Sequence, residues 1–286
     1  ITREYILPEL YSKMGLNNCI EIQDNVIEFI IENYTCESGV RKLKEYLFKI
    51  IGEINLEQLK NSNNIELPIK LNISDIEHKY LKTHHKVNIT KINDEPLVGI
   101  INGLWANSLG NGGIIHIQTK YMPSNNLLEL KLTGQQGDVM QESMNVAKTL
   151  ALNLLSEQEK DILFKNLENN KFKGIHIHCP EGAMKKDGPS AGIAITMALY
   201  SLFTNKRIKN NIALTGEINL QGNVTEIGGL DCKIIGGIKA GVKHFIYPKT
   251  NSKDFNDFKE KYKTKKLENI KFNEVSNVYN VIDLIF

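Results

Sequence analysis

The hydrophobic pattern changes near residue 88, and this change limits the folds open to the chain. Before it, apolar residues recur every three or four positions over 6–14 and 26–34, and again in a longer segment that begins near Ser38. Such spacing is typical of amphipathic helices. After it, short β-type segments alternate with helical ones. We therefore predict a small all-α domain over residues 1–87 and an α/β (α+β) domain over residues 88–286.

Six segments of the second domain have the apolar alternation and the flanking turn residues of β-strands. Strands are expected at residues 96–105, 112–120, 127–133, 174–179, 211–216 and 243–248. Helices are expected at residues 138–155, 189–203, 231–241 and 276–284. This alternation predicts an α/β layout with a compact core.

The composition argues against several functional classes. A net charge of +2 is too balanced to indicate nucleic acid as the main partner. No run reaches the roughly 18 apolar residues that cross a bilayer, so no membrane partner is expected. The four cysteines form no Cys-x-x-Cys pair, which argues against a zinc ribbon and a disulfide framework. We expect a reducing compartment and no bound metal.

The segment MKKDGPSAG places Ser190 between a proline and an alanine, just before an apolar helix. Pro189 suits the first turn of a helix, because its missing N–H costs nothing there. Ser190 would then lie at the positive end of the helix, where free N–H groups stabilise an oxyanion. Gly188 and Gly192 would let a substrate backbone come close. Both a presented nucleophile and an ordinary helix start are compatible with these residues.

A nucleophilic serine needs a base, and His244 is one candidate. With Asp231 it would complete a Ser-His-Asp esterase site, and GPSAG matches the G-x-S-x-G elbow of α/β-hydrolases. In that elbow the serine follows a strand directly. Here a loop of about ten residues separates the expected strand from Ser190, so the match to the elbow is weak.

Lys233 is the other candidate base. On a helix that starts near Asp231 it shares one face with three small residues, Gly236, Gly237 and Ala240. Close packing on that face would desolvate the amine and lower its pKa toward neutrality, as a lysine base requires. A surface lysine in a lysine-rich chain is the alternative interpretation.

The stretches around Ser190 and Lys233 together resemble the Lon family of ATP-dependent proteases. EGAMKKDGPSAG and ALTGEINLQGNVTEIGGLDCK are similar to the family's serine and lysine motifs, PKDGPSAG and IGGLKEK. The resemblance continues upstream through GLWANSLGNGGIIHIQT and LTGQQGDVMQES. It extends to ITREYILPELYSKMGL and YTCESGVRKL, which look like the helical lid of the family's AAA+ ATPase module. It therefore covers nearly the whole chain.

This resemblance implies a Lon-type proteolytic domain of the A-type, preceded by a AAA+ lid, and it implies roles for single residues. Ser190 matches the nucleophile and Lys233 the general base. Thr215 matches the threonine that steadies the lysine amine. Asp187 matches the aspartate that influences access to the nucleophile, and Glu217 matches the glutamate that follows the threonine motif.

Further positions follow from the same resemblance. His176 and His178 match paired histidines that lie beside the site without acting as its base. Arg41 matches the lid arginine that senses nucleotide, which needs the ATPase core that the resemblance places before this chain. Asp231 and Cys232 replace the Lys-Glu of the family motif. At two residues from Lys233 on a helix, the Asp231 carboxylate should not face the amine.

The implied activity is that of an ATP-dependent serine endopeptidase that degrades unfolded or damaged proteins, as a homo-oligomer, in a hexameric ring. ATP and Mg²⁺ are implied as cofactors of the full-length protein. This chain has no G-x-x-x-x-G-K-[ST] loop, so it is expected to bind neither alone. The implied compartment is the cytoplasm or, alternatively, the mitochondrial matrix.

Trp105 is interpreted as an aromatic of the core or of the domain junction.

Two other functions stay open. One is the esterase with Ser190, Asp231 and His244, and the other is a non-catalytic fragment that mediates assembly. Replacement of His244 separates the first from the peptidase, because only the esterase would lose activity.

Overall fold

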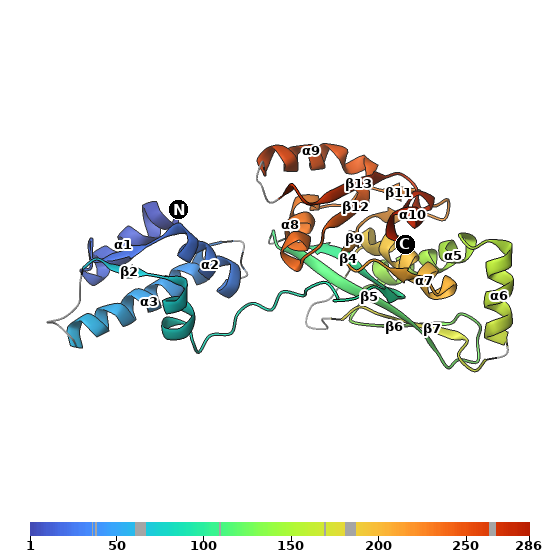
Figure 1. Ribbon diagram of the computed structural model, residues 1–286, viewed down its shortest axis with the longest axis horizontal. Coiled ribbons are helices and arrows are strands. Elements are labelled where there is room, and N and C mark those ends of the chain that lie inside the picture. The colour runs from blue at the N-terminus through green and yellow to red at the C-terminus, as the bar shows by residue number, and fades with distance from the viewer. Residues whose placement is uncertain are drawn as a thin grey trace. The chain divides into compact units, whose positions relative to one another are not determined.

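The computed structural model describes residues 1–35, 37, 39–60, 67–108, 110–168, 170–180, 187–262 and 267–286. The chain divides into two compact units, Ile1–Asn88 and Ile89–Phe286 (Figure 1). The hydrophobic residues buried in each unit pack among themselves. Among the described helices, none combines the length and the apolar composition that crossing a bilayer requires.

The first unit is helical, as predicted, with one short parallel sheet added. The apolar faces of its helices form a single core, and α1 ends at Gly15, whose φ of 68° favours glycine. The strands β1 and β2 are too short for an alternating pattern to stand out in the sequence. The elements are a π-helical turn Thr2–Ile6, α1 (Leu7–Met14), β1 (Ile20–Ile22), α2 (Asp24–Tyr34), α3 (Arg41–Lys60), β2 (Ile69–Leu71), α4 (Ile73–Asp75) and a second π-helical turn Ile76–Tyr80.

The second unit has a seven-stranded mixed sheet with strand order β13-β12-β9-β4-β5-β7-β6. Its strands are β4 (Ile100–Ala106), β5 (Gly112–Met122), β6 (Leu130–Thr133), β7 (Gly174–His178), β9 (Ile212–Leu214), β12 (His244–Pro248) and β13 (Lys271–Val275). Two small antiparallel pairs join β3 (Leu97–Val98) to β8 (Arg207–Ile208), and β10 (Glu217–Ile218) to β11 (Val224–Thr225). The helices are α5 (Asp138–Asn153), α6 (Glu157–Glu168), α7 (Gly192–Thr204), α8 (Leu230–Ala240), α9 (Ser252–Lys261) and α10 (Ile282–Ile285).

Successive side chains of the central strands serve two cores, one on each face of the sheet. Ile115 belongs to the core formed with α5, α6 and α7, whereas its neighbour Ile114 belongs to the core formed with α8 and α9. Figure 1 shows the two groups of helices on different sides of the sheet. The helix α7 is buried almost throughout, which explains why its sequence is apolar on every side.

The helix α8 lies so close to β5 that backbone meets backbone. A Cβ added to Gly236 would lie 2.1 Å from the carbonyl carbon of Gly112. A Cβ added to Gly112 would lie 2.1 Å from the carbonyl oxygen of Cys232. Both distances are far shorter than real contacts, so these two positions require glycine. The first turn of α8, which carries Lys233, is held against the start of β5 in this way.

The predicted strands and helices of the second unit are present with shifts at their ends, except that the helix predicted at 276–284 is a 3-10 helix, Val278–Val281, followed by the short α10. The first predicted strand is split into β3 and β4 at Gly99, whose φ is 70°. The elements of the unit that were not predicted are the helices α6 and α9, the edge strand β13 and the two-residue strands β8, β10 and β11. The two helices bury only two residues each, and in β13 only Val275 is buried, so their apolar patterns are weak. In the first unit, α3 begins at Arg41, and Ser38 lies outside the described residues.

Candidate active site

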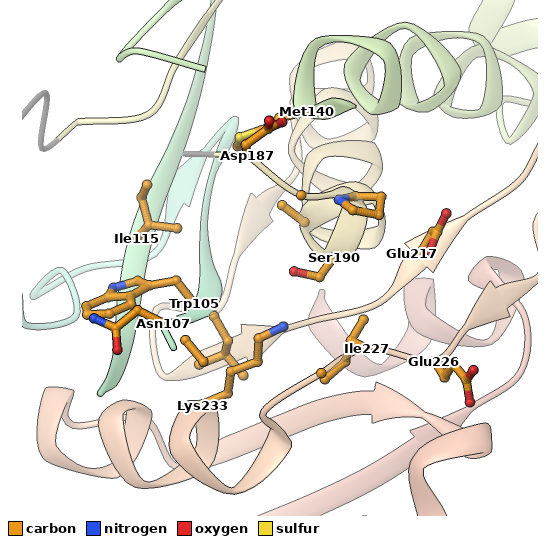
Figure 2. Close-up of a pocket in the computed structure, with 16 residues that line it drawn as sticks. Trp105, Asn107, Ile115, Met140, Asp187, Ser190, Glu217, Glu226, Ile227 and Lys233 are labelled. Carbon is orange, nitrogen blue, oxygen red and sulfur yellow. The ribbon is translucent and has the colours of Figure 1, made fainter. Parts of the chain in front are cut away.

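A cavity of about 500 Å³ lies where β4 ends. Its walls come from the end of β4, the turn before α7, the start of β10 and the segment that enters α8. Four of the residues singled out from the sequence line it, Asp187, Ser190, Glu217 and Lys233 (Figure 2). The fold thus brings together residues as far apart in the sequence as Asp187 and Lys233.

Ser190 lies in a 3-10 turn, Pro189–Ala191, that leads directly into α7. Ser190 was expected in the first turn of an α-helix, but that turn is a 3-10 turn and the α-helix begins at Gly192. Two backbone hydrogen bonds hold the segment. The Gly216 N–H donates to the Ser190 carbonyl at 2.8 Å, and the Ile193 N–H donates to the Gly216 carbonyl at 3.1 Å. In Figure 2 the Ser190 hydroxyl and the Lys233 amine extend into the same space.

The two glycines that flank Ser190 differ in their surroundings. Gly188 lines the cavity and has a φ of 154°, in the region that favours glycine. Gly192 is buried, and a Cβ there would lie 2.7 Å from Cγ1 of Ile218. The expectation that Gly192 admits a substrate backbone is therefore wrong. Its small size serves the close packing of α7 on β10.

Lys233 is only 3% exposed, and its face of α8 is the predicted one, since Gly236, Gly237 and Ala240 are buried with it. Burial lowers the pKa of Lys233 from 10.5 to about 8, because desolvation disfavours the ammonium form. The Asp231 carboxylate accepts the Cys232 N–H at 2.8 Å, at the half-buried start of the helix. Desolvation alone accounts for the shift of the lysine pKa, as expected for an aspartate that does not face the amine.

Thr215 connects the two candidate residues. It is fully buried just after β9, where its N–H donates to the Ile246 carbonyl at 3.1 Å. The Lys233 Nζ donates to the Thr215 Oγ1 at 3.0 Å, and the Thr215 hydroxyl donates to the Ser190 carbonyl at 3.2 Å. One hydroxyl can accept and donate in this way at the same time. Thr215 therefore fixes the amine relative to the main chain of Ser190.

Asp187 lies against the start of α5. A Cβ added to Gly137, the residue before the helix, would lie 2.3 Å from Cγ of Asp187. A carboxylate in this place is favoured by the positive end of the helix dipole. The contact fixes the chain three residues before Ser190. Met184, Lys185 and Lys186 of the same motif lie outside the described residues.

His176 and His178 lie on β7 and share the hydroxyl of Thr133. The Thr133 Oγ1 is 2.8 Å from Nε2 of His176 and 2.7 Å from Nδ1 of His178. Burial, and next the charge of Lys131, lowers the pKa of His176. Neither histidine is among the described residues that line the cavity. Their visible role is to join β7 to the edge strand β6.

Two other candidates are not among the described residues that line the cavity. Arg41 belongs to the first unit, at the start of α3, where its 89% exposed side chain contacts Glu45 at 3.2 Å. His244 is buried on β12, and its Nε2 is 2.7 Å from Oδ1 of Asn273. It is not among the described residues of the cavity wall, so the Ser-His-Asp arrangement is not formed.

Several cavity residues were missed, and Trp105 was interpreted differently. It is half-buried and packs against the core, but it also lines the cavity, and its Nε1 donates to the Ile114 carbonyl at 3.2 Å. A tryptophan at the end of a predicted strand was the available signal. The other missed lining residues are Leu104, Ala106, Asn107, Ile115, Met140, Ala191, Glu226, Ile227 and Gly228.

Fold and sequence together define the class of the chain, a proteolytic domain preceded by the lid of an ATPase. Residues 72–286 match the Lon protease (S16) C-terminal proteolytic domain, and residues 12–65 match the Lon protease AAA+ ATPase lid domain. The chain belongs to the Lon protease family.

Its relatives include bacterial proteins and a mitochondrial one. The chain is 33% identical to the Lon protease of Fervidobacterium nodosum over 99% of its length, and 37% identical to that of Clostridium beijerinckii over 92%. It is 35% identical to the mitochondrial Lon protease homolog of Drosophila melanogaster over 90% of its length. It spans 33%, 31% and 25% of these proteins, which is a third or less of each.

Proposed function

We propose that this chain is a serine endopeptidase in which Ser190 is the nucleophile and Lys233 its general base. The main support for this proposal is that both residues line one cavity, in which burial lowers the pKa of Lys233 to about 8. Neutral Lys233 takes the hydroxyl proton while the Ser190 oxygen attacks the peptide carbonyl. The lysine then gives that proton to the departing amine. Water, deprotonated by the same lysine, hydrolyses the acyl-enzyme and restores Ser190.

The proposal assigns supporting roles to the residues around this pair. Thr215 orients the lysine amine through the 3.0 Å hydrogen bond to its Nζ. Backbone N–H groups beside Ser190 stabilise the oxyanion. Two donors at the start of α7 are already engaged, because the N–H groups of Gly192 and Ile193 bond to the carbonyls of Pro189 and Gly216. The donors therefore have to come from the turn itself or from the loop before it.

Two variants of the chain test this mechanism. Ser190→Ala removes the nucleophile, so cleavage of a fluorogenic peptide should fall by about 10⁴-fold or more. Labelling by a serine-directed covalent probe should disappear with it. The exposed Ser276 is not among the described residues that line the cavity. The Ser276→Ala variant should therefore keep both peptide cleavage and probe labelling. Undiminished peptide cleavage by Ser190→Ala at an unchanged melting temperature would contradict the proposal, and lack of labelling of the unmodified chain would favour an assembly fragment.

We further propose that ATP dependence resides in parts of the full-length protein beyond these residues. The chain has no phosphate-binding G-x-x-x-x-G-K-[ST] loop, and Arg41 lies exposed against Glu45. The lid residues present thus do not fit a nucleotide by themselves. A rise in melting temperature with Mg-ATP would contradict this, because binding to the folded state alone stabilises it.

Family membership supports three more proposals about the full-length protein. Its substrates are unfolded or damaged proteins, and its subunits assemble in a hexameric ring. Its compartment is the cytoplasm or the mitochondrial matrix, the latter in line with the name of the Drosophila relative. Degradation assays and mass measurement of the assembled protein test the first two.

A further inference from the structure

The cavity wall differs between its two sides. Trp105, Asn107 and Ile115 lie on one side of the Ser190–Lys233 pair, and Glu217 and Glu226 lie on the other (Figure 2). A peptide bound with its carbonyl at Ser190 extends in both directions from the scissile bond. Its side chains on one side of that bond therefore meet an aromatic and apolar wall. Those on the other side meet the two glutamates.

Both glutamates are held in place by the backbone around them. Glu217 is half-buried, and the residue before it, Gly216, is hydrogen-bonded to the Ser190 carbonyl. Glu226 is exposed and precedes Ile227, whose N–H and C=O both bond to the buried side chain of Asn251, at 3.0 and 2.9 Å. The pairing of Glu217 with Thr225 between β10 and β11 keeps the two glutamates on neighbouring strand ends.

The charge of the cavity favours a cation. In the described part of the chain, three acidic residues line it, Asp187, Glu217 and Glu226, against one basic residue, Lys233. Among the residues that the structure describes, neither glutamate takes part in a salt bridge. A bound peptide excludes water from the cavity wall. The carboxylate of the half-buried Glu217 would then lose its hydration, which is unfavourable unless a positive group of the peptide takes the place of the water.

We propose that Glu217 and Glu226 select substrates with a lysine or arginine beside the scissile bond, on the side away from Trp105. The inference rests on the proposed peptidase function of the same cavity. A long basic side chain reaches a carboxylate while its methylene stem stays on the apolar floor of the cavity, which Ile227 helps to form. An acidic side chain at that position meets like charges and is rejected.

The test uses fluorogenic peptides that differ at one position near the scissile bond, as Lys, Gln or Glu, with each flanking position varied in turn. At one or more positions on a single side, the unmodified chain should cleave the Lys peptide with a kcat/KM about tenfold or more above that of the Glu peptide. Added salt should reduce this ratio, because it screens charges at the open end of the cavity.

Glu226→Gln should bring the Lys-to-Glu ratio toward one, and Glu226→Lys should invert it, while Glu217→Gln should also reduce it. The exposed Glu268 lies outside the cavity, so Glu268→Gln should leave the ratio unchanged. Since the readout is a ratio within each variant, a general loss of activity cannot imitate the effect. Equal cleavage of the Lys, Gln and Glu peptides at all positions would overturn this inference alone. Failure to cleave any peptide would overturn the proposed function and this inference with it.

Discussion

The two faces of α8 place lysines in opposite environments. Lys233 is buried beside glycines that meet β5 and Phe245, and its pKa is lowered to about 8. Lys239, six residues further along the same helix, is exposed on another face. The two side chains are chemically identical, so their difference comes from packing alone. A general base is made here by removing water from an amine, and the glycines of α8 and β5 allow the backbones to approach closely enough to do so.

The largest expected effect separates the two lysines by activity. Lys233→Arg should lower kcat/KM for a peptide by about 10³-fold or more, because a guanidinium stays protonated and cannot take the serine proton. Lys239→Arg keeps an exposed charge on another face of the helix and should change kcat/KM by less than about twofold. Steady-state assays of the two variants, with melting temperatures as a check of folding, make the comparison. An essential Lys239 with a dispensable Lys233 would reverse the assignment.

A second prediction concerns the glycine contact that buries Lys233. Gly236→Ala would place a Cβ 2.1 Å from the Gly112 backbone, so α8 must move, at a cost of about 3 kcal/mol of unfolding free energy. Gly52 is the matched control, since it lies inside α3 and an added Cβ would meet only Cε of Met14 at 3.8 Å. Gly52→Ala should stabilise its unit by up to about 1 kcal/mol, from helix propensity. Urea denaturation measures both, and equal effects of the two substitutions would refute the close-contact account.

A third prediction follows from the direction of the lysine pKa shift. The folded pKa of about 8 lies below the ordinary 10.5, so the unfolded chain binds more protons between these values and stability rises with pH there. Below about pH 8 the buried ammonium costs up to about 3 kcal/mol. Lys233→Met removes this cost but also removes the hydrogen bond to Thr215, which contributes about 1 kcal/mol. The variant should therefore still be more stable than the parent chain near pH 7. The gain should shrink toward about pH 10, and Lys239→Met should show neither effect. A variant no more stable than the parent chain near pH 7 would contradict the burial of a chargeable amine.

The sequence predicts this helix face better than it predicts the rest of the cavity. The helical period alone places Lys233 with its small neighbours, and the structure confirms that face. In contrast, the segment that carries Glu226 and Ile227 is held at the cavity by two hydrogen bonds between the Ile227 main chain and the side chain of Asn251, which is 24 positions beyond Ile227. Contacts of this kind leave no local pattern. The packing role of Gly192 was missed for the same reason, because the side chain that it contacts, Ile218, belongs to a strand far along the chain.

Local patterns also fail where an element buries little. The helix α9 has only two buried residues, Phe255 and Phe258, and its many charged residues hide the apolar stripe. The six strands with clear alternation were found, whereas β13 at the sheet edge was not. His176 and His178 show a different limit. The family motif aligns them beside the site, but the structure pairs them with Thr133 on the edge strand, away from the described cavity wall.

The rate at which a serine-directed covalent probe labels Ser190, measured against pH, tests the central claim most directly. If neutral Lys233 is the base, the rate should rise about tenfold per pH unit below the lysine pKa and level off above about 8. Lys233→Arg should abolish that rise, while Lys239→Arg should leave the profile unchanged. A midpoint near 6.5 would indicate a histidine base instead. A rate that does not vary with pH, or a profile that Lys233→Arg leaves intact, would contradict the account.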